Sequence, residues 1–180
     1  MQSFPCSVRH WNRIANEVLD PRSFEASYDL GDGTFDIRSW RSMLRNQLAT
    51  RRDYRSDISG ARFKPADRVH LHEGMFTRAQ IPRGIDWHYM IFHEYNCFLL
   101  HEKEHIPLPP NRIQCYWLSV CRHGQPVVDD WIDNLPWKVR PDTPWAGTDG
   151  REIVLDILRN SMETTWDLWE LAAKQFGAII

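Results

Sequence analysis

The sequence predicts an α+β fold, in which a short β-hairpin lies within a mainly helical single domain. Apolar residues recur at three- and four-residue steps in several segments, which is the pattern of amphipathic helices. Two short stretches, 69–72 and 97–100, have instead the alternating or continuous apolar pattern of strands. A chain of 180 residues that is 42% hydrophobic is large enough for one core.

The first predicted helix runs from Asp36, which can cap its N-terminus, to about Arg51. Its apolar stripe consists of Ile37, Trp40, Met43, Leu44 and Leu48. The other side carries arginines, which suit contact with phosphates and exposure to water equally, at positions 38, 41, 45 and 52.

The hairpin is predicted from two segments that end in histidines. Val69 to His72 alternates, so His70 and His72 are expected on one face of a strand. The segment CFLLHEKE, which lies between Asn96 and His105, is expected to begin as a buried strand and to end as one turn of helix. Pro107 stops this turn, because proline removes a backbone donor.

The remaining elements are predicted to be helical. Asn111 can cap a helix with inward residues Ile113, Tyr116, Trp117 and Val120, and a second apolar stripe consists of Val127, Val128, Trp131 and Ile132. A helix of about 40 Å is then expected from Asp149 to about Phe176. We expect it to clasp its own domain, with a second subunit as the alternative.

Charge is distributed unevenly along the chain, although the formal net charge is only −2. Residues 38–83 contain eleven Arg and Lys against four Asp and Glu, whereas the chain after Arg122 contains five against ten. Such a concentration can steer a polyanion to one face, and it is equally typical of solvated helix faces.

The sequence also predicts the cellular compartment of the protein and whether its cysteines are free. No apolar run is long enough to cross a membrane, and the N-terminus lacks the apolar core of a signal peptide, so we expect a cytoplasmic protein without membrane contact. The four cysteines contain no C-x-x-C pair and are expected to be free thiols.

Histidines are concentrated between positions 70 and 105, together with Asn96 and several acids. Neutral imidazoles and carboxylates that converge from separate elements can hold a divalent ion against a phosphate. Asn96 precedes His105 by nine positions. On this spacing the chain resembles the HNH endonucleases, the ββα-metal nucleases, with His72-Glu73, Asn96 and His105 at the three motif positions.

The resemblance covers roughly residues 40–138 and implies an N-terminal extension (1–35), an HNH nuclease core (36–138) and a C-terminal connector with a long helix (139–180). It implies a central ββα-metal motif and the cytoplasm of a prokaryotic or phage-infected cell. His-Glu at the first motif position departs from the family pattern. The zinc-binding cysteines that many members carry correspond here to Ser56, Ser59, His101 and Glu104, so we expect no structural zinc.

The resemblance also implies roles for the site residues. His105 is expected as a metal ligand and His72 as a ligand at the first motif position, while Glu73 occupies the position of the general base; the exchanged roles are the alternative. Asn96 ties the motif loop together or contacts the metal. Two more histidines, His70 and His101, are expected either to bind the metal or to orient its ligands. Arg78 is expected to contact a phosphate.

One divalent metal ion is expected. A carboxylate-bearing site favours Mg²⁺ or Mn²⁺, which we expect first, and a mainly imidazole site favours Ni²⁺, Co²⁺ or Zn²⁺. The function implied is metal-dependent hydrolysis or nicking of DNA. The alternatives are a catalytically weak or inactive nuclease-like module that binds DNA or protein, and histidines that serve only the core. The partner expected first is DNA, and the C-terminal helix is a candidate contact for a homodimer or a phage-assembly partner.

Overall fold

The computed structural model of the chain describes residues 37–77, 80, 91–106, 109–135, 143–160 and 166–177. Within these ranges the α+β class is confirmed by six helices and a two-stranded antiparallel sheet. The elements are α3 (Ile37–Arg51), β1 (Val69–Glu73), β2 (Cys97–His101), α5 (Glu102–His105), α6 (Arg112–His123), α7 (Gln125–Asn134), α8 (Gly150–Asn160) and α9 (Trp166–Phe176). The predicted extension, residues 1–35, lies outside the described residues. No helix in the described ranges has both the length and the apolarity to cross a membrane.

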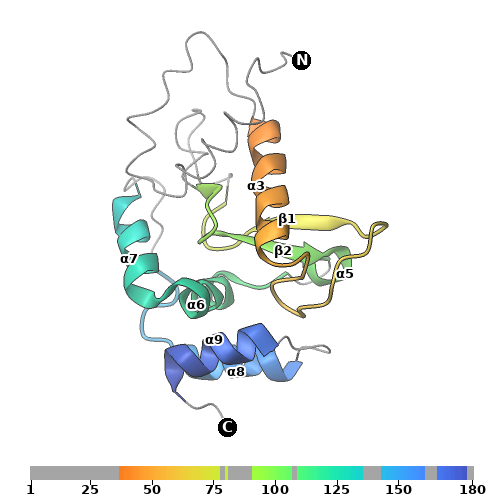
Figure 1. Cartoon of the computed structure of the whole chain (residues 1–180). Helices are drawn as coiled ribbons and strands as arrows, with labels where there is room; N and C mark the ends of the chain where they lie inside the picture. Colours follow the sequence, from red (N-terminus) through yellow and green to blue (C-terminus); the bar gives the residue numbers. More distant parts are fainter. Residues whose placement is uncertain are drawn as a thin grey trace.

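The hairpin forms the middle layer of the fold. Strand β1 pairs with β2 from Val69 opposite His101 to Glu73 opposite Cys97. Figure 1 shows α3 above this hairpin, α6 below it, and α8 with α9 below α6. The four apolar residues of β2, from Cys97 to Leu100, are buried because helices cover the sheet on both sides. The β-β-α order predicted for 69–105 is therefore observed.

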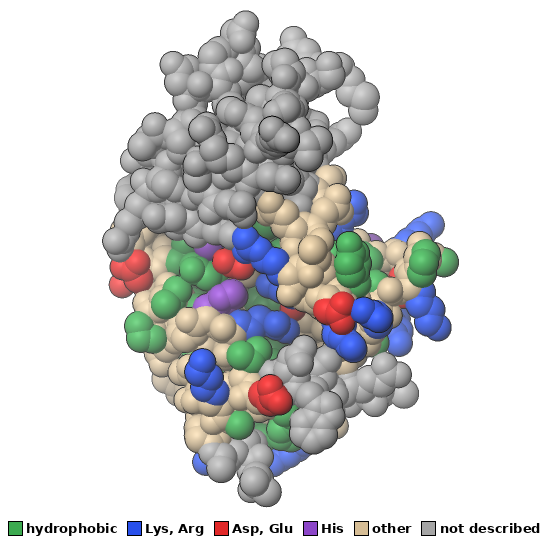
Figure 2. All heavy atoms as spheres, viewed as in Figure 1, with side chains coloured by type: hydrophobic (Ala, Val, Ile, Leu, Met, Phe, Trp, Pro, Cys, Tyr) green, Lys and Arg blue, Asp and Glu red, His purple; other side chains and the backbone are tan. Residues whose placement is uncertain are grey.

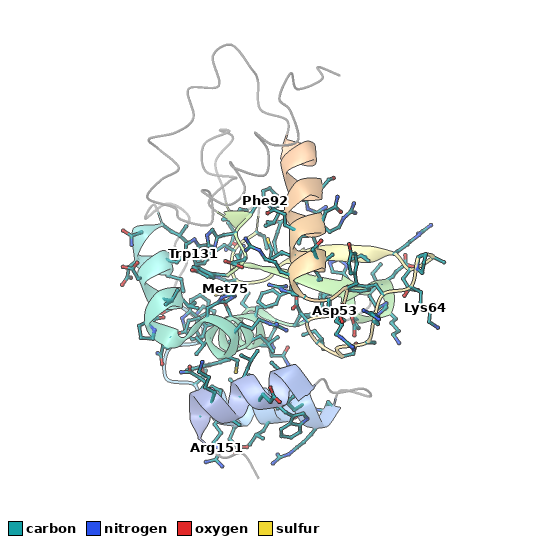
Figure 3. All side chains as sticks on the ribbon, in the orientation of Figure 1. Asp53, Lys64, Met75, Phe92, Trp131 and Arg151 are labelled. Atoms are coloured by element: carbon teal, nitrogen blue, oxygen red, sulfur yellow. The ribbon has the colours of Figure 1, made fainter. Side chains whose placement is uncertain are left out.

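The core lies between the hairpin and the helices that follow it. Met75 and Trp131 both lie in this space (Figure 3) and are 0% and 2% exposed. Helix α6 begins as predicted, because the Asn111 side chain accepts a hydrogen bond from the backbone of Gln114 at 3.0 Å. In α7 the predicted apolar stripe is buried except for Val127. Val127 is 44% exposed, so the prediction that it faces the core is wrong.

Gly74 is required where β1 ends and approaches α6. A Cβ atom at this position would lie 2.6 Å from Cys115 Cβ and 2.7 Å from a ring carbon of Phe98. Gly150 is in the same situation, because its Cβ would lie 2.2 Å from the Trp117 ring. Both glycines therefore allow close packing against α6. The described cysteines, at 97, 115 and 121, are free and buried.

The single helix predicted from Asp149 to Phe176 is wrong. Two helices, α8 and α9, occupy this region, and each contacts the other and α6. Apolar residues of both helices belong to the same buried cluster as the hairpin, among them Leu158 and Leu168. The physical reason is length: α6 has 12 residues and spans about 18 Å, so it cannot cover a straight helix of about 40 Å. Both helices clasp their own domain, as we expected of this segment.

Candidate metal centre

Three histidines meet on one side of the hairpin, and we call His70, His72 and His105 the histidine cluster. The alternation of β1 places His70 and His72 on the same face, and α5 directly after β2 brings His105 against both. The ring centres of His70 and His105 are 4.8 Å apart, and those of His72 and His105 are 5.3 Å apart. The predicted juxtaposition of His72 and His105 is therefore present.

The two ring contacts differ in what they permit. The lone pairs of an imidazole lie in the ring plane, so each ring that binds an ion turns an edge toward it, and rings stacked face to face do not do so. His72 and His105 meet at 73°, whereas His70 and His105 are stacked at 18°. Nitrogen-to-metal bonds of about 2 Å place two ligating rings with centres about 5 Å apart. The separation of His72 and His105 is thus compatible with one shared ion, and His70 stacks against the His105 ring.

His72 is held in a defined orientation. Its Nε2 lies 3.2 Å from the carbonyl oxygen of Pro110, which makes Nε2 the protonated nitrogen of a neutral ring and leaves the lone pair on Nδ1. Burial lowers the pKa of His72, and the nearby His105 lowers it further, against the opposing effect of the Pro110 hydrogen bond. A neutral, oriented imidazole is the form that binds a metal ion or accepts a proton.

His105 is also kept neutral. Desolvation lowers its pKa first, and the nearby His70 and Arg41 lower it further. Its Nδ1 is buried and has no hydrogen-bond partner within the described part of the chain. A buried polar atom without a partner is costly to a fold, and such atoms commonly mark sites that bind something.

The donors fit a metal ion in type and fall short in number. Among the described residues, no group of three or more His, Cys, Asp or Glu is arranged to hold an ion. Two converging imidazoles leave the remaining positions of a divalent ion for water and substrate. Imidazole donors favour Zn²⁺, Ni²⁺ or Co²⁺ over Mg²⁺.

Glu73 lies away from the histidine cluster. The ladder continues through the Glu73–Cys97 pair, so the alternation of the strand is kept and successive side chains point to opposite faces. The Glu73 carboxylate is 3.7 Å from Nε of Arg41, and its side chain is 8% exposed. A bend that would bring His72 and Glu73 to one side does not occur within β1.

His101 also faces away from the cluster. It pairs with Val69, and residues directly opposite in a sheet share a face, so it lies on the side opposite His70. Its Nδ1 is 3.7 Å from an Asp67 oxygen, and its ring is 4.5 Å from that of Phe63. The structure therefore does not bring together His101 and the other candidate ligands.

Asn96 uses all of its hydrogen-bonding capacity on the loop that follows β1. Its Oδ1 accepts from the backbone of Met75 at 2.8 Å and of Phe76 at 2.9 Å, and its Nδ2 donates to the carbonyls of Phe76 and Ile91 at 2.8 and 2.9 Å. The side chain is 0% exposed. Of the roles expected for Asn96, this geometry matches the one that ties the loop together.

Ser56, Ser59, His101 and Glu104, which the resemblance places at zinc-ligand positions, are joined by hydrogen bonds. Ser56 Oγ donates to the Glu104 carboxylate at 2.7 Å, and the same carboxylate oxygen accepts the backbone N–H of His101 at 2.7 Å. Ser56 Oγ also accepts from the backbone of Ser59 at 3.4 Å. This network links the loop after α3 to the start of α5.

A buried charge network was missed by sequence reasoning. Asp57 pairs with Arg52 and Arg122, the latter at 2.9 Å, and accepts the backbone N–H of Leu99 at 2.5 Å. The Asp57 side chain is 1% exposed and that of Arg52 is 10% exposed, so Arg52 serves this network and is largely withdrawn from solvent. No short-range spacing could have revealed it, since its members come from three distant segments. The predicted phosphate contact, Arg78, lies outside the described residues.

Comparisons with known proteins give no relative: no protein-family model, no curated protein and no solved structure matches this chain.

Proposed function

We propose that this protein is a divalent-metal-dependent DNA endonuclease or nickase of the HNH type. The observation that carries the proposal is the convergence of His72 and His105, from a hairpin and the helix directly after it, with ring centres 5.3 Å apart and planes at 73°. The loop-tying hydrogen bonds of Asn96 support it, because they hold the end of β1 in place.

In this proposal His72 and His105 hold the ion, and His70 keeps the His105 ring in position by stacking. A bound divalent ion would stabilise negative charge on the scissile phosphate and on the leaving oxygen. In this proposal the Glu73 carboxylate forms an ion pair with Arg41. Arg41 also donates to the Leu71 carbonyl at 2.6 Å, and so joins α3 to the edge of β1. We therefore give Glu73 a supporting role in place of the general-base role that its sequence position implied.

The test is cleavage of supercoiled plasmid across Mg²⁺, Mn²⁺, Co²⁺, Ni²⁺ and Zn²⁺ with His72→Ala, Glu73→Ala and His105→Ala prepared in parallel. We expect the histidine variants to lose about a hundredfold or more in rate, and Glu73→Ala to lose about tenfold or less. Transition-metal ions should support cleavage better than Mg²⁺, because the donors are imidazoles. Full activity of His105→Ala would contradict the proposal.

Metal binding can be measured without activity. Zn²⁺ or Ni²⁺ should raise the melting temperature of the wild-type chain, since a ligand that binds only the folded state stabilises it. The same ions should leave the melting temperatures of His72→Ala and His105→Ala nearly unchanged. An equal rise in all three proteins would show that the ion binds elsewhere.

A second candidate is a nuclease-like module that binds DNA or protein without cleaving. It is favoured by the lack of a third ligand in the described ranges and by the direction of Glu73, which turns the nearest strand carboxylate away from the cluster. A gel-shift assay that detects DNA binding, combined with intact plasmid under every metal ion, would select this candidate.

A further inference from the structure

A pocket of about 790 Å³ lies between α3 and the outer edge of β1. Its lining includes Arg41 and Arg45 from α3, Tyr54 and Phe63 from the loop after α3, and Arg68 and His70 at the start of β1. We call this the basic pocket. Its volume is within the range of sites that hold small ligands. Figure 2 shows Lys and Arg side chains gathered on the part of the molecule that carries this loop, with hydrophobic side chains between them.

Arg45 supplies a cation that the fold does not use. Its guanidinium makes no hydrogen bond or ion pair with any other residue in the described ranges. Neighbouring arginines differ: Arg51 pairs with Glu94 at 3.2 Å and Arg62 with Asp53 at 2.8 Å. Arg68 pairs with Glu102 at 3.2 Å, but its side chain is 79% exposed, so this pair is weak and readily exchanged for an anionic ligand.

Tyr54 supplies an exposed aromatic face on a fixed backbone. Its side chain is 52% exposed, which is unusual for a residue with so large an apolar ring. Its N–H donates to the Ala49 carbonyl at 2.7 Å and its own carbonyl accepts from Phe63 at 2.7 Å. The ring therefore projects from a position held on both sides, in a left-handed conformation with φ of 55°.

The basic pocket adjoins the histidine cluster through a shared residue. His70 lines the pocket and stacks on His105 with ring centres 4.8 Å apart. A chain that carries a phosphate at His105 and His72 can therefore continue into the pocket past His70. The cations and the aromatic ring in one pocket match the two parts of a nucleotide, its phosphate and its base.

We propose that the basic pocket binds an unpaired nucleotide of the DNA strand next to the phosphodiester at the histidine cluster. The base stacks on Tyr54, and Arg45 and Arg68 contact the flanking phosphates. An unpaired base is specified because a base within a duplex has both faces covered by its neighbours and cannot stack on a side chain. This assignment rests on the proposed function and names where its substrate strand lies.

Binding is measured by fluorescence anisotropy in EDTA, so that no cleavage occurs, with a labelled single-stranded DNA of about twelve nucleotides and with a blunt hairpin of related sequence. Tyr54→Leu keeps bulk and removes the ring, whereas Tyr54→Phe keeps the ring. Arg45→Gln removes the unpaired cation. Arg151→Gln is the matched control, because Arg151 is an exposed arginine on α8 and lies far from Asp53 and Lys64 (Figure 3).

We expect Tyr54→Leu to weaken binding of the single strand by about tenfold while Tyr54→Phe and Arg151→Gln bind like the wild type. Arg45→Gln should weaken it by about threefold or more and should reduce its dependence on salt concentration. Wild-type affinity in Tyr54→Leu, an equal loss on the hairpin, or tighter binding of RNA than of DNA would each overturn the proposal.

The two proposals fail in different ways. If no metal ion supports cleavage but the variants change single-strand binding as expected, the nuclease function is wrong and the pocket assignment stands. If plasmid is cleaved through His105 but Tyr54→Leu and Arg45→Gln bind and cleave like the wild type, the site is correct and the pocket assignment is wrong.

Discussion

The histidine cluster and the buried charge network around Asp57 are both polar groups packed against the same hairpin, yet they differ in whether opposite charges pair them. Asp57 is bonded to two arginines and to the backbone of β2. In the cluster, Nδ1 of His105 is buried without a partner among the described residues, and two rings meet edge to face. A carboxylate paired with opposite charges serves the stability of the fold, whereas an imidazole nitrogen left without a partner is available to a ligand.

The largest expected loss of stability comes from removing the paired carboxylate of Asp57. Asp57→Ala should destabilise the protein by about 3–5 kcal/mol, because it leaves Arg52 and Arg122 close together without a counter-charge. Urea unfolding followed by tryptophan fluorescence measures the loss. Asp57→Asn, which keeps an acceptor for the Leu99 N–H, should lose less. A loss below about 1 kcal/mol in Asp57→Ala would show that the network does not stabilise the fold.

Asn96→Ala should cost slightly less, about 3 kcal/mol, because it leaves buried backbone groups of Met75, Phe76 and Ile91 without partners. Asn96→Asp keeps the two accepted bonds but places a carboxylate oxygen against the carbonyls of Phe76 and Ile91 at a fully buried position, so it should cost at least as much. The same urea experiment tests both variants. If Asn96 acted only in catalysis, Asn96→Ala would unfold at the wild-type urea concentration and lose only its activity.

Acid should weaken the fold through His123, a histidine outside the cluster. Burial, followed by the charges of Arg52 and Arg122, lowers the pKa of His123 to about 3. The folded state therefore prefers the neutral ring, so its stability is complete above the unfolded pKa of about 6.5 and falls as the pH drops from there toward 3.

The slope expected from this one group is about 1.4 kcal/mol per pH unit in that window. Unfolding free energies measured from pH 7 to pH 4 give the slope, and His123→Gln should reduce it because glutamine does not titrate. Identical pH profiles for the two proteins would assign the acid sensitivity to other groups.

The smallest expected effect on stability is that of removing the His105 ring from the histidine cluster. His105→Ala should change the unfolding free energy by less than about 1 kcal/mol, because Nδ1 loses no hydrogen bond within the described structure. Its metal-induced rise in melting temperature should disappear all the same. A large loss of stability in the absence of metal would place His105 among the structural residues and remove the contrast with Asp57.

Local pattern was enough to predict the hairpin and the residues that meet on it. The alternation of 69–72 placed His70 and His72 on one face, and CFLLHEKEH indicated a strand followed by a short helix that carries His105. The face on which Glu73 lies depends instead on the register of the two strands. Whether Glu73 shares the side of His72 depends on whether the ladder continues past His72, which is a property of the pairing with Cys97 and has no signal in β1 alone.

Contacts between distant segments could not be predicted in the same way. Arg52, Asp57, Leu99 and Arg122 have no common spacing, and the unusual status of Arg45 emerges only once its neighbours are seen to be paired. The C-terminal helix was predicted as too long for a similar reason. Its periodicity is continuous in sequence, and the limited length of α6 that must cover it is a fact of three dimensions.

The shared core of the hairpin, α6, α8 and α9 has a consequence for synthesis on the ribosome. All three clustered histidines leave the ribosome well before α8 and α9, because the chain is made from its N-terminus. Until those helices arrive, the face of α6 around Trp117 lacks its covering at Gly150 and Phe176. The nascent chain therefore holds every residue of the cluster before it holds the two helices that complete the shared core.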